Sequence, residues 1–417
     1  MEKNVIKQII LRWQELIAQI ELTPRDLILD PAANHVLVGI RRAGKSYLLY
    51  QHIQQLIKEG HSMEEMLFVN FEDERIMDIT KDELHLILDS YRELFPHQPI
   101  IFLDEIQNID GWEHFARRLA DEKYQVFITG SNAKMLSREI AMALGGRYLL
   151  SEIYPFSFEE FLRHRGLHLS AHWELSPAKA DVVRMMGEYF YTGGLSECFD
   201  IADKRAWHQS LYDKILLSDI VVRNHIRNER SLKLLVRKLA DSVMQPTSIK
   251  RLQNILQGDG SKITRDTIAD YLGYMHDAYL TFSISNYSDS LSERATIQKH
   301  YFYDNGILNL FIINPETKLL ENLVAIQLYR KHGDRLLYFN KNVEVDFYVP
   351  DDSLLVQVSY SIADAATRKR EIDAIKKTAK FLQPKTVQIV TYNEEEVIEE
   401  DGVHIEVMPI FKWVMEG

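Results

Sequence analysis

Four short apolar runs alternate with segments of helical spacing in the first 131 residues, and no other feature constrains the fold of this chain as strongly. The runs lie at residues 35–40, 66–73, 99–106 and 124–131 and read HVLVGI, MLFVNFED, PIIFLDEI and YQVFITGS. Continuous apolar strands separated by helices are typical of a parallel sheet that helices cover on both faces. We therefore predict the α/β fold class, with such a sheet in residues 1–150.

The turn after the first run carries a phosphate-binding motif. Residues 39–46, GIRRAGKS, fit G-x-x-x-x-G-K-[ST] at every position, with an apolar strand before the motif and a helix after it. Glycines let the backbone N–H groups point at phosphate oxygens, Lys45 brings a positive charge to the outer phosphates, and the Ser46 hydroxyl can ligate Mg²⁺. The alternative is a chance match in a glycine-containing turn. The expected cofactor-binding residues are Gly39, Arg41, Arg42, Ala43, Gly44, Lys45, Ser46 and Tyr47.

Two carboxylates, Asp104 and Glu105, end the third apolar run. Open α/β sheets bind ligands at the carboxyl ends of their strands, so we expect Asp104 to hold Mg²⁺ through water or together with Ser46. Glu105 is expected to polarise the attacking water as general base. A solvated acidic turn is the alternative, and the phosphate-binding motif upstream argues against it.

Two further positions are candidates for the same site. Ser131 and Asn132 end the fourth run, where a polar side chain can touch a γ-phosphate or orient water; a helix cap is an equally good interpretation. Arg147 follows two glycines and can reach a neighbouring subunit's γ-phosphate as an arginine finger, or be a surface arginine after a helix end. The expected catalytic residues are Lys45, Glu105, Asn132 and Arg147.

These stretches together resemble the AAA-superfamily P-loop ATPases of bacteria and archaea. One family of that group combines an AAA core, a winged helix and a C-terminal domain of the PD-(D/E)XK, restriction-endonuclease-like type. The resemblance covers nearly the whole chain and rests on GIRRAGKSYLL, FVNFEDE, IFLDEIQNIDGWE, ITGSNAKML, GGRYL, IYPFSFEEFL, YFYTGG, DTIADYLGYMHDAYL, YFYDNGILN and LLENLVAIQL. It implies ATP and Mg²⁺ as cofactors, Asp104 and Glu105 as the Walker B pair, and Asn132 as the sensor.

The expected organisation has four parts. Residues 1–150 form the AAA-type P-loop core, and residues 151–222 form a helical lid or connector. Several short helices followed by two strands suit a winged helix at 223–313. Residues 314–417 alternate strands and helices in a small α/β unit that resembles the restriction-endonuclease-like type.

A nuclease of that type needs an acidic residue on one strand, an acidic-x-Lys pattern on the next and a helix Glu, converging on metal ions. Glu321 lies on the expected helix and Asp346 on a strand, but the next strand carries Gln357 and Ser359. Glutamine brings no charge, and serine does not replace the lysine. We therefore expect a degenerate site in a structural or binding module; an active nuclease requires that Gln357 and Ser359 be bypassed.

The charge balance limits the partners. With 49 Lys and Arg against 61 Asp and Glu, the net charge is −12, which argues against wholesale coating of nucleic acid or of a membrane surface. Residues 223–238 are locally basic, with Arg223, Arg227, Arg230 and Arg237 spaced for one face of a helix. Such a face can contact DNA phosphates or bound nucleotide, but a solvated face with ion pairs is the favoured interpretation.

Cysteine usage and hydropathy indicate the compartment. The single cysteine, Cys198, can form no internal disulfide, and no apolar run approaches the ~20 residues that span a bilayer. We expect a cytoplasmic protein without a membrane partner.

The function expected from these features is ATP hydrolysis by an AAA-type motor or switch that acts on DNA. Because an AAA core usually needs an arginine from a neighbour, we expect a homo-oligomer, with a hexameric ring as the leading arrangement. The alternatives are a nucleotide-dependent scaffold that recruits a protein partner and an ATP-dependent nuclease.

Overall fold

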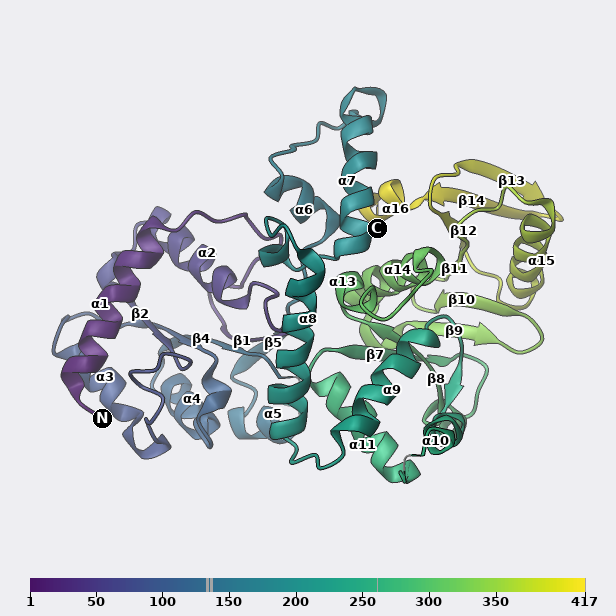
Figure 1. The fold of residues 1–417 in the computed structure, drawn as a ribbon. Coiled ribbons are helices and arrows are strands. Elements are labelled where there is room, and N and C mark those ends of the chain that lie inside the picture. The colour runs from purple at the N-terminus through teal and green to yellow at the C-terminus, as the bar shows by residue number, and fades with distance from the viewer. Residues whose placement is uncertain (133–134, 136–137, 261, 417) are drawn as a thin grey trace. The chain divides into compact units, whose positions relative to one another are not determined.

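The computed structural model describes residues 1–132, 135, 138–260 and 262–416 (Figure 1). Three residues of the ITGSNAKML stretch, at positions 133, 134 and 136, lie outside the described residues. The chain divides into two compact units. Unit 1 comprises residues 1–156 with 277–279, and unit 2 comprises residues 157–276 and 280–417.

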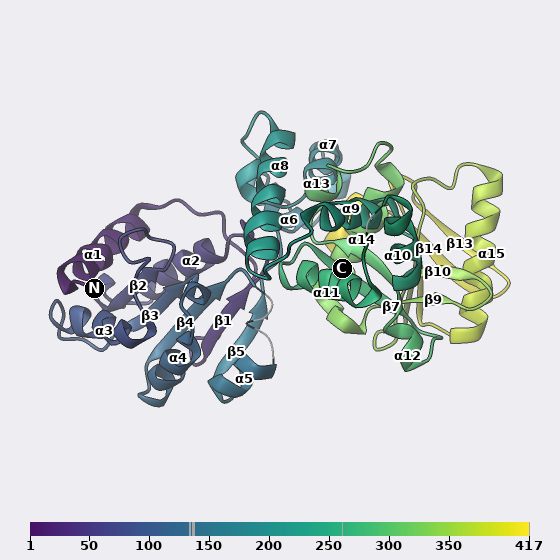
Figure 2. The same cartoon turned by 60° about the horizontal axis from the view of Figure 1, so that its bottom comes forward.

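Unit 1 is built on a five-stranded sheet with the order β2-β3-β4-β1-β5, in which every neighbouring pair is parallel (Figure 2). Its strands are β1 (Asn34–Val38), β2 (Met66–Asn70), β3 (Ile100–Asp104), β4 (Gln125–Gly130) and β5 (Tyr148–Glu152). Its helices are α1 (Lys3–Gln19), α2 (Lys45–Lys58), α3 (His85–Arg92), α4 (Trp112–Asp121) and α5 (Arg138–Leu144), with 3₁₀ turns at Met63–Glu65, Lys81–Glu83 and Ile106–Asn108. The predicted α/β fold with a parallel sheet is confirmed.

The apolar runs became these strands because almost all of their side chains are buried. All five residues of β3 are buried, as are four of the five in β1 and in β2. The sequence did not predict β5, whose pattern is less apolar: Leu149 is 50% exposed and Leu150 38% exposed. The strand pairs with β1 over its whole length and ends at Glu152, just past the expected domain boundary at 150/151.

Unit 2 contains a nine-stranded sheet with the order β13-β14-β12-β11-β10-β9-β7-β8-β6. Its strands are β6 (Thr247–Ser248), β7 (Thr281–Asn286), β8 (Ile297–Phe302), β9 (Leu337–Asn340), β10 (Glu344–Val349), β11 (Leu354–Val358), β12 (Thr386–Thr391), β13 (Glu396–Glu400) and β14 (Val403–Pro409). Helices α6 (Phe158–His164), α7 (Ala178–Thr192), α8 (Lys204–Lys214), α9 (Glu229–Asp241), α10 (Ile249–Gly258) and α11 (Arg265–Asp277) lie largely before the sheet in sequence. The remaining helices are α12 (Leu291–Arg294), α13 (Asn305–Leu308), α14 (Glu316–His332), α15 (Ala365–Leu382) and α16 (Ile410–Glu416).

The nine-stranded sheet crosses the expected boundary at 313/314. Strand β7 pairs in parallel with β9 through Ser285↔Leu337 and Asn286↔Tyr338, so the strands before and after residue 313 belong to one sheet. Strand β8 is antiparallel to β7 on its other side. This pairing brings Lys299 of β8 near Glu321 of α14 and Asp346 of β10.

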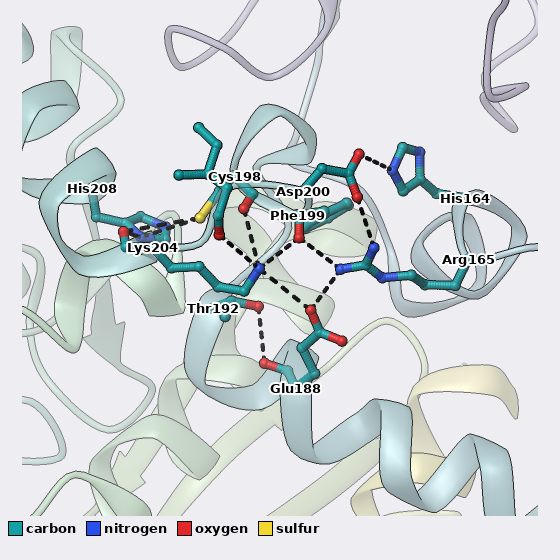
Figure 3. A network of polar contacts seen from close by, with 10 residues as sticks. His164, Arg165, Glu188, Thr192, Cys198, Phe199, Asp200, Lys204 and His208 are labelled. Carbon is teal, nitrogen blue, oxygen red and sulfur yellow. Dashed lines mark hydrogen bonds and ion pairs between the residues drawn. The ribbon is translucent and has the colours of Figure 1, made fainter.

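A polar network links the residue after α6 with α7 and with the start of α8 (Figure 3). The Arg165 guanidinium donates to Glu188 Oε1 at 2.6 Å, and Lys204 Nζ donates to the carbonyl of Phe199 at 2.5 Å. Cys198 Sγ lies 3.6 Å from His208 Nδ1, but burial raises the pKa of the Cys198 thiol to about 12. This thiol is therefore a packing group and no nucleophile.

The basic segment 223–238 does not form the single helical face that its spacing predicts. Helical structure stops at Val222, and α9 begins only at Glu229, capped by the Asn228 side chain, which accepts from the Ser231 N–H at 3.1 Å. Two of the four spaced arginines, at positions 223 and 227, therefore lie outside α9. The non-helical residues between Val222 and the N-cap Asn228 break the regular spacing.

Candidate functional site

The phosphate-binding motif forms the turn between β1 and α2. Gly44 has φ 87°, a left-handed conformation that favours glycine, and α2 starts at the next residue, Lys45. Gly39 is required for a different reason: a Cβ there would lie 2.1 Å from the carbonyl oxygen of Ile153. The turn thus passes directly against the chain that leaves β5. It ends in a helix N-terminus, where backbone N–H groups favour an anion.

Lys45 is buried, with 4% of its surface exposed, and its ammonium lies inside the turn. Nζ is 3.1 Å from the carbonyl oxygens of Gly39 and of Ile40 and 3.8 Å from Glu105 Oε1. The side chain that the sequence assigned to the phosphates therefore projects toward the concave side of the turn and toward the end of β3.

Asp104 ends β3 and is fully buried. Its Oδ1 accepts from Ser46 Oγ at 3.0 Å and from Thr129 Oγ1 at 2.5 Å, while Oδ2 accepts from Asn70 Nδ2 at 2.9 Å. Burial, followed by repulsion from Glu105, raises the pKa of Asp104 to about 7. A hydroxyl and a carboxylate at this distance are the hard oxygen ligands that Mg²⁺ prefers, so the pair fits that ion.

Glu105 adopts a left-handed backbone conformation with φ 55°, which turns its side chain back toward the motif. Its Oε1 accepts from Ser131 Oγ at 2.8 Å and its Oε2 from Gln107 Nε2 at 2.5 Å. Burial works to raise the pKa of Glu105, but Lys45, Gln107 and Ser131 together lower it. The carboxylate is therefore kept ionised and fixed on both oxygens.

The other predicted residues lie at different distances from this centre. Asn132 is 7% exposed and follows Ser131 directly. Tyr47 lies on the first turn of α2, is 49% exposed, and its ring centroid lies 5.4 Å from that of Tyr50 in a tilted arrangement. Arg41 pairs with Glu72 at 3.0 Å, and Arg42 has a left-handed φ of 66°. Ala43 is buried in the turn.

Arg147 lies at the far end of the sheet. It directly precedes β5, whose first residue Tyr148 pairs with Asn34 at the start of β1, whereas the motif follows the end of β1. Four strand residues separate the two ends, or ~13 Å. Arg147 Nε lies 2.6 Å from Asp121 Oδ1.

Arg25 was not predicted from the sequence, and it lies against the phosphate-binding turn and the chain after β5. This buried guanidinium donates to the carbonyl of Ala43 at 2.7 Å and to that of Tyr154 at 2.9 Å, and it lies 4.7 Å from the Phe156 ring centroid. Gln107 was missed as well. Its position two residues after Glu105 was a usable signal, whereas nothing around Arg25 forms a motif.

The four residues of the expected degenerate site line one cavity of about 830 Å³ in unit 2. Glu321 on α14, Asp346 on β10, Gln357 on β11 and Ser359 directly after β11 all line this cavity. Burial, then repulsion from Asp346, raises the pKa of Glu321 to about 7.

A lysine that the sequence analysis did not include joins this cluster. Lys299 of β8 is fully buried, and its Nζ lies 3.0 Å from Asp346 Oδ1, 2.9 Å from Glu344 Oε1 and 3.4 Å from Glu321 Oε1. Burial opposes its charge, but the neighbouring carboxylates raise the pKa of Lys299 well above its ordinary value. The ammonium is therefore charged.

Among residues 1–132, 135, 138–260 and 262–416, no group of three or more His, Cys, Asp or Glu side chains is arranged to hold a metal ion. Within the same residues, no helix combines the length and apolar character needed to span a bilayer.

Comparison with known proteins identifies relatives for both parts of the chain. Residues 33–162 match the family model of the AAA domain, and residues 184–317 match a domain of unknown function, DUF8612. The uncharacterised protein MJ1544 of Methanocaldococcus jannaschii is 34% identical over 430 residues, covering 99% of this chain and 95% of the relative. An uncharacterised protein of Haemophilus influenzae is 29% identical over 392 residues, covering 91% and 94%.

Among solved structures, the Walker-type ATPase PABY2304 of Pyrococcus abyssi is similar with a TM-score of 0.42 and 14% identity. The match covers 72% of this chain and 100% of that one. The AAA part of the expected resemblance is confirmed by the family match over residues 33–162.

Proposed function

The chain belongs to the protein family of MJ1544 and contains an AAA domain, and on this premise we propose that it binds ATP with Mg²⁺ and hydrolyses the nucleotide. One observation carries the proposal. At the ends of β1 and β3, Ser46 Oγ lies 3.0 Å from Asp104 Oδ1 while Lys45 Nζ lies 3.8 Å from Glu105 Oε1. A cation for phosphates, an oxygen pair for Mg²⁺ and a fixed carboxylate for water are thus side by side.

Each residue has one task in this scheme. The N–H groups of the turn and the Lys45 ammonium bind and orient the outer phosphates. Ser46 and Asp104 hold Mg²⁺, which when bound neutralises charge on the phosphate oxygens. Glu105 accepts the proton of the attacking water, and Ser131 and Gln107 keep its carboxylate in place.

Asn132 and Arg147 belong to the proposal at different sites. Asn132 follows Ser131 and is assigned to the γ-phosphate. Arg147 lies at the opposite end of the strands from the motif, so we assign it to the nucleotide of a neighbouring copy. This assignment implies a homo-oligomer, for which a hexameric ring is our working arrangement.

The finer parts of the functional hypothesis concern unit 2. We propose that residues 223–313 act as a winged helix, that residues 314–417 are a catalytically degenerate restriction-endonuclease-like module, and that the assembly acts on DNA in the cytoplasm. Support comes from the order of helices and strands in sequence and from the loss of the acidic-x-Lys pattern at Gln357 and Ser359.

The central test is ATP hydrolysis by the purified full-length chain. Lys45→Ala is expected to abolish ATP binding in calorimetry, whereas Glu105→Gln is expected to bind ATP and to hydrolyse it 10²–10⁴-fold more slowly, the usual contribution of a general base. Gln98→Ala, at an exposed side chain that donates to the Lys123 carbonyl, is the matched control. Absence of a calorimetric signal with ATP and Mg²⁺ for the wild-type chain would refute the proposal.

A second candidate is a nucleotide-dependent scaffold that turns over slowly. The observation that favours it is the double restraint on Glu105, because both of its oxygens are engaged by Ser131 and Gln107. Hydrolysis rates with single-stranded, duplex and branched DNA separate the two: stimulation with salt-sensitive binding favours the DNA-acting motor. Turnover that no nucleic acid changes favours the scaffold.

A further inference from the structure

Three carboxylates of the cavity in unit 2 converge on the ammonium of Lys299. Three of their oxygens, from Asp346, Glu344 and Glu321, lie 2.9 to 3.4 Å from Lys299 Nζ. The ammonium has no exposed surface and extends from β8, outside the segment that supplies the carboxylates. Carboxylate oxygens that converge on one point attract a cation, and here the covalently attached ammonium occupies that point.

Two of the three remaining oxygens of the cluster are also engaged within the chain. Asp346 Oδ2 accepts from the Val358 N–H at 3.0 Å, and Glu344 Oε2 accepts from Asn340 Nδ2 at 3.0 Å. The Tyr301 hydroxyl donates to Glu321 Oε1 at 2.7 Å. A metal ion would have to replace these donors as well as the ammonium.

Gln357 and Ser359, which replace the acidic-x-Lys pattern, also have their side chains engaged in hydrogen bonds within the chain. The Gln357 amide accepts from the Asp346 N–H at 3.2 Å and donates to Glu371 Oε2 at 2.8 Å, and the Ser359 hydroxyl donates to the Ser361 carbonyl at 3.0 Å. Glu321 Oε2 is the exception in the cluster: it is buried and has no hydrogen-bond partner among the described residues. One monodentate oxygen is too little to hold a hard divalent ion.

From this geometry we propose that Lys299 fills the cation position of the carboxylate cluster, so that the cavity in unit 2 takes no divalent metal ion. The inference is independent of the ATPase proposal, because it concerns residues of unit 2 alone. It also gives a physical reason for the expected lack of nuclease chemistry, since that chemistry needs a metal-bound water where the ammonium lies.

The test is Mn²⁺ binding to the full-length chain without nucleotide. Binding is measured by the loss of the electron paramagnetic resonance signal of free Mn²⁺. All variants carry Asp104→Asn, which removes the carboxylate of the nucleotide site from the measurement. The chain with Lys299 intact is expected to take up no Mn²⁺ in unit 2. Lys299→Ala removes the ammonium and opens its position, and we expect Mn²⁺ affinity to rise by about ten-fold or more, the scale of a single change at a metal site.

Lys376→Ala is the matched control. Lys376 also lies between carboxylates, 2.6 Å from Glu400 Oε1 and 2.9 Å from Asp401 Oδ2, but these acids are about half exposed. An equal gain of Mn²⁺ affinity in Lys376→Ala overturns the proposal, because the gain would then not depend on the converging position. A folded Lys299→Ala that gains no affinity overturns it too.

A second measurement does not require Lys299→Ala to fold. Uptake of Mn²⁺ by the chain with Lys299 intact, lost on Asp346→Asn, contradicts the proposal directly. If Lys299→Ala is recovered folded only when Mn²⁺ is present, the ion has taken over the role of the ammonium and the proposal is supported.

Discussion

Single side chains hold Glu105, the base of the proposed mechanism. Gln107 donates to its Oε2 and is one of the groups that lower its pKa. Gln107→Ala should therefore raise the pKa of Glu105, so that more of the base is protonated at a given pH. We expect the acidic limb of the pH–rate profile for ATP hydrolysis to move to higher pH, with kcat reduced by about ten-fold and KM unchanged.

Steady-state kinetics across the pH range, with Gln98→Ala alongside, check this prediction. A purely structural role for Gln107 would change thermal stability and KM while leaving the limb of the profile in place. An unshifted limb would therefore remove Gln107 from the list of positioning residues. Since Ser131 holds the other oxygen, Ser131→Ala should shift the profile in the same direction.

Asp104 offers a second prediction at the residue scale, because burial raises its pKa to about 7. A carboxyl whose pKa is raised on folding stabilises the nucleotide-free protein at low pH, and this contribution is lost as pH rises through about 7. Mg²⁺ needs the ionised form, so its binding releases a proton below that pH. Mg²⁺ affinity of the ATP complex should fall by about ten-fold from pH 8 to pH 6.

Calorimetric Mg²⁺ titrations at fixed ATP, in buffers of different ionisation enthalpy, measure both the affinity and the released proton. Thr129→Val removes a hydroxyl that donates to Asp104 and lowers its pKa, so it should move the transition to higher pH. Equal Mg²⁺ affinity at pH 6 and pH 8 would show that Asp104 is ionised throughout and would contradict the prediction.

At the scale of elements, Arg25 joins the segment before β1 to the phosphate-binding turn and to the chain after β5. Two hydrogen bonds of its guanidinium end on buried carbonyls of Ala43 and Tyr154. Arg25→Met keeps much of the side-chain volume and removes both donors. We expect the free energy of unfolding to fall by about 3–6 kcal/mol, since hydrogen bonds from charged groups contribute about 1.5–3 kcal/mol each.

Urea denaturation of the nucleotide-free chain measures that change. The control is Arg118→Met on α4, where an exposed pair with Glu122 at 3.5 Å is expected to contribute less than about 1 kcal/mol. ATP affinity should weaken in Arg25→Met as well, because Ala43 is part of the turn. Equal stability losses in the two variants would mean that Arg25 does not fix the turn.

The elements also show where reasoning from sequence succeeds. The first four strands of unit 1 were predictable because continuous burial makes them continuously apolar, and the turn between β1 and α2 because its glycines and lysine are local in sequence. Lys299 was not predictable in this way. Its place beside Asp346 depends on the pairing of β7 with β9, whose paired residues are 52 positions apart in the sequence. A single lysine in a strand does not indicate which distant strand will lie beside it.

Strand β5 and the basic segment illustrate two other causes. The exposed Leu149 and Leu150 break the pattern of burial that identified the other strands, so pairing with β1 had to be seen to assign β5. In residues 223–238 the charge spacing was correct, but a turn with a left-handed His225 separates the helical segment that ends at Val222 from α9. Periodicity of the charges does not reveal such a break.

On the scale of the whole molecule, the position of Arg147 leads to a prediction about assembly. This residue precedes β5 and the motif follows β1, so the two lie at opposite ends of a pair of neighbouring parallel strands. In the proposed arrangement Arg147 therefore acts on the nucleotide of another copy, through a head-to-tail interface. Arg147→Ala should therefore bind ATP normally and lose turnover, as should Glu105→Gln for a different reason.

Mixing the two inactive variants separates this arrangement from a site complete within one chain. An Arg147→Ala copy still supplies Glu105, and a Glu105→Gln neighbour still supplies Arg147, so some interfaces in a mixed assembly are intact. With random pairing of equal amounts, about a quarter of wild-type turnover should return, at concentrations where the copies associate. Activity that stays at the level of either variant alone, in an assembly shown by light scattering to be mixed, would exclude Arg147 as the residue that one copy contributes to the next.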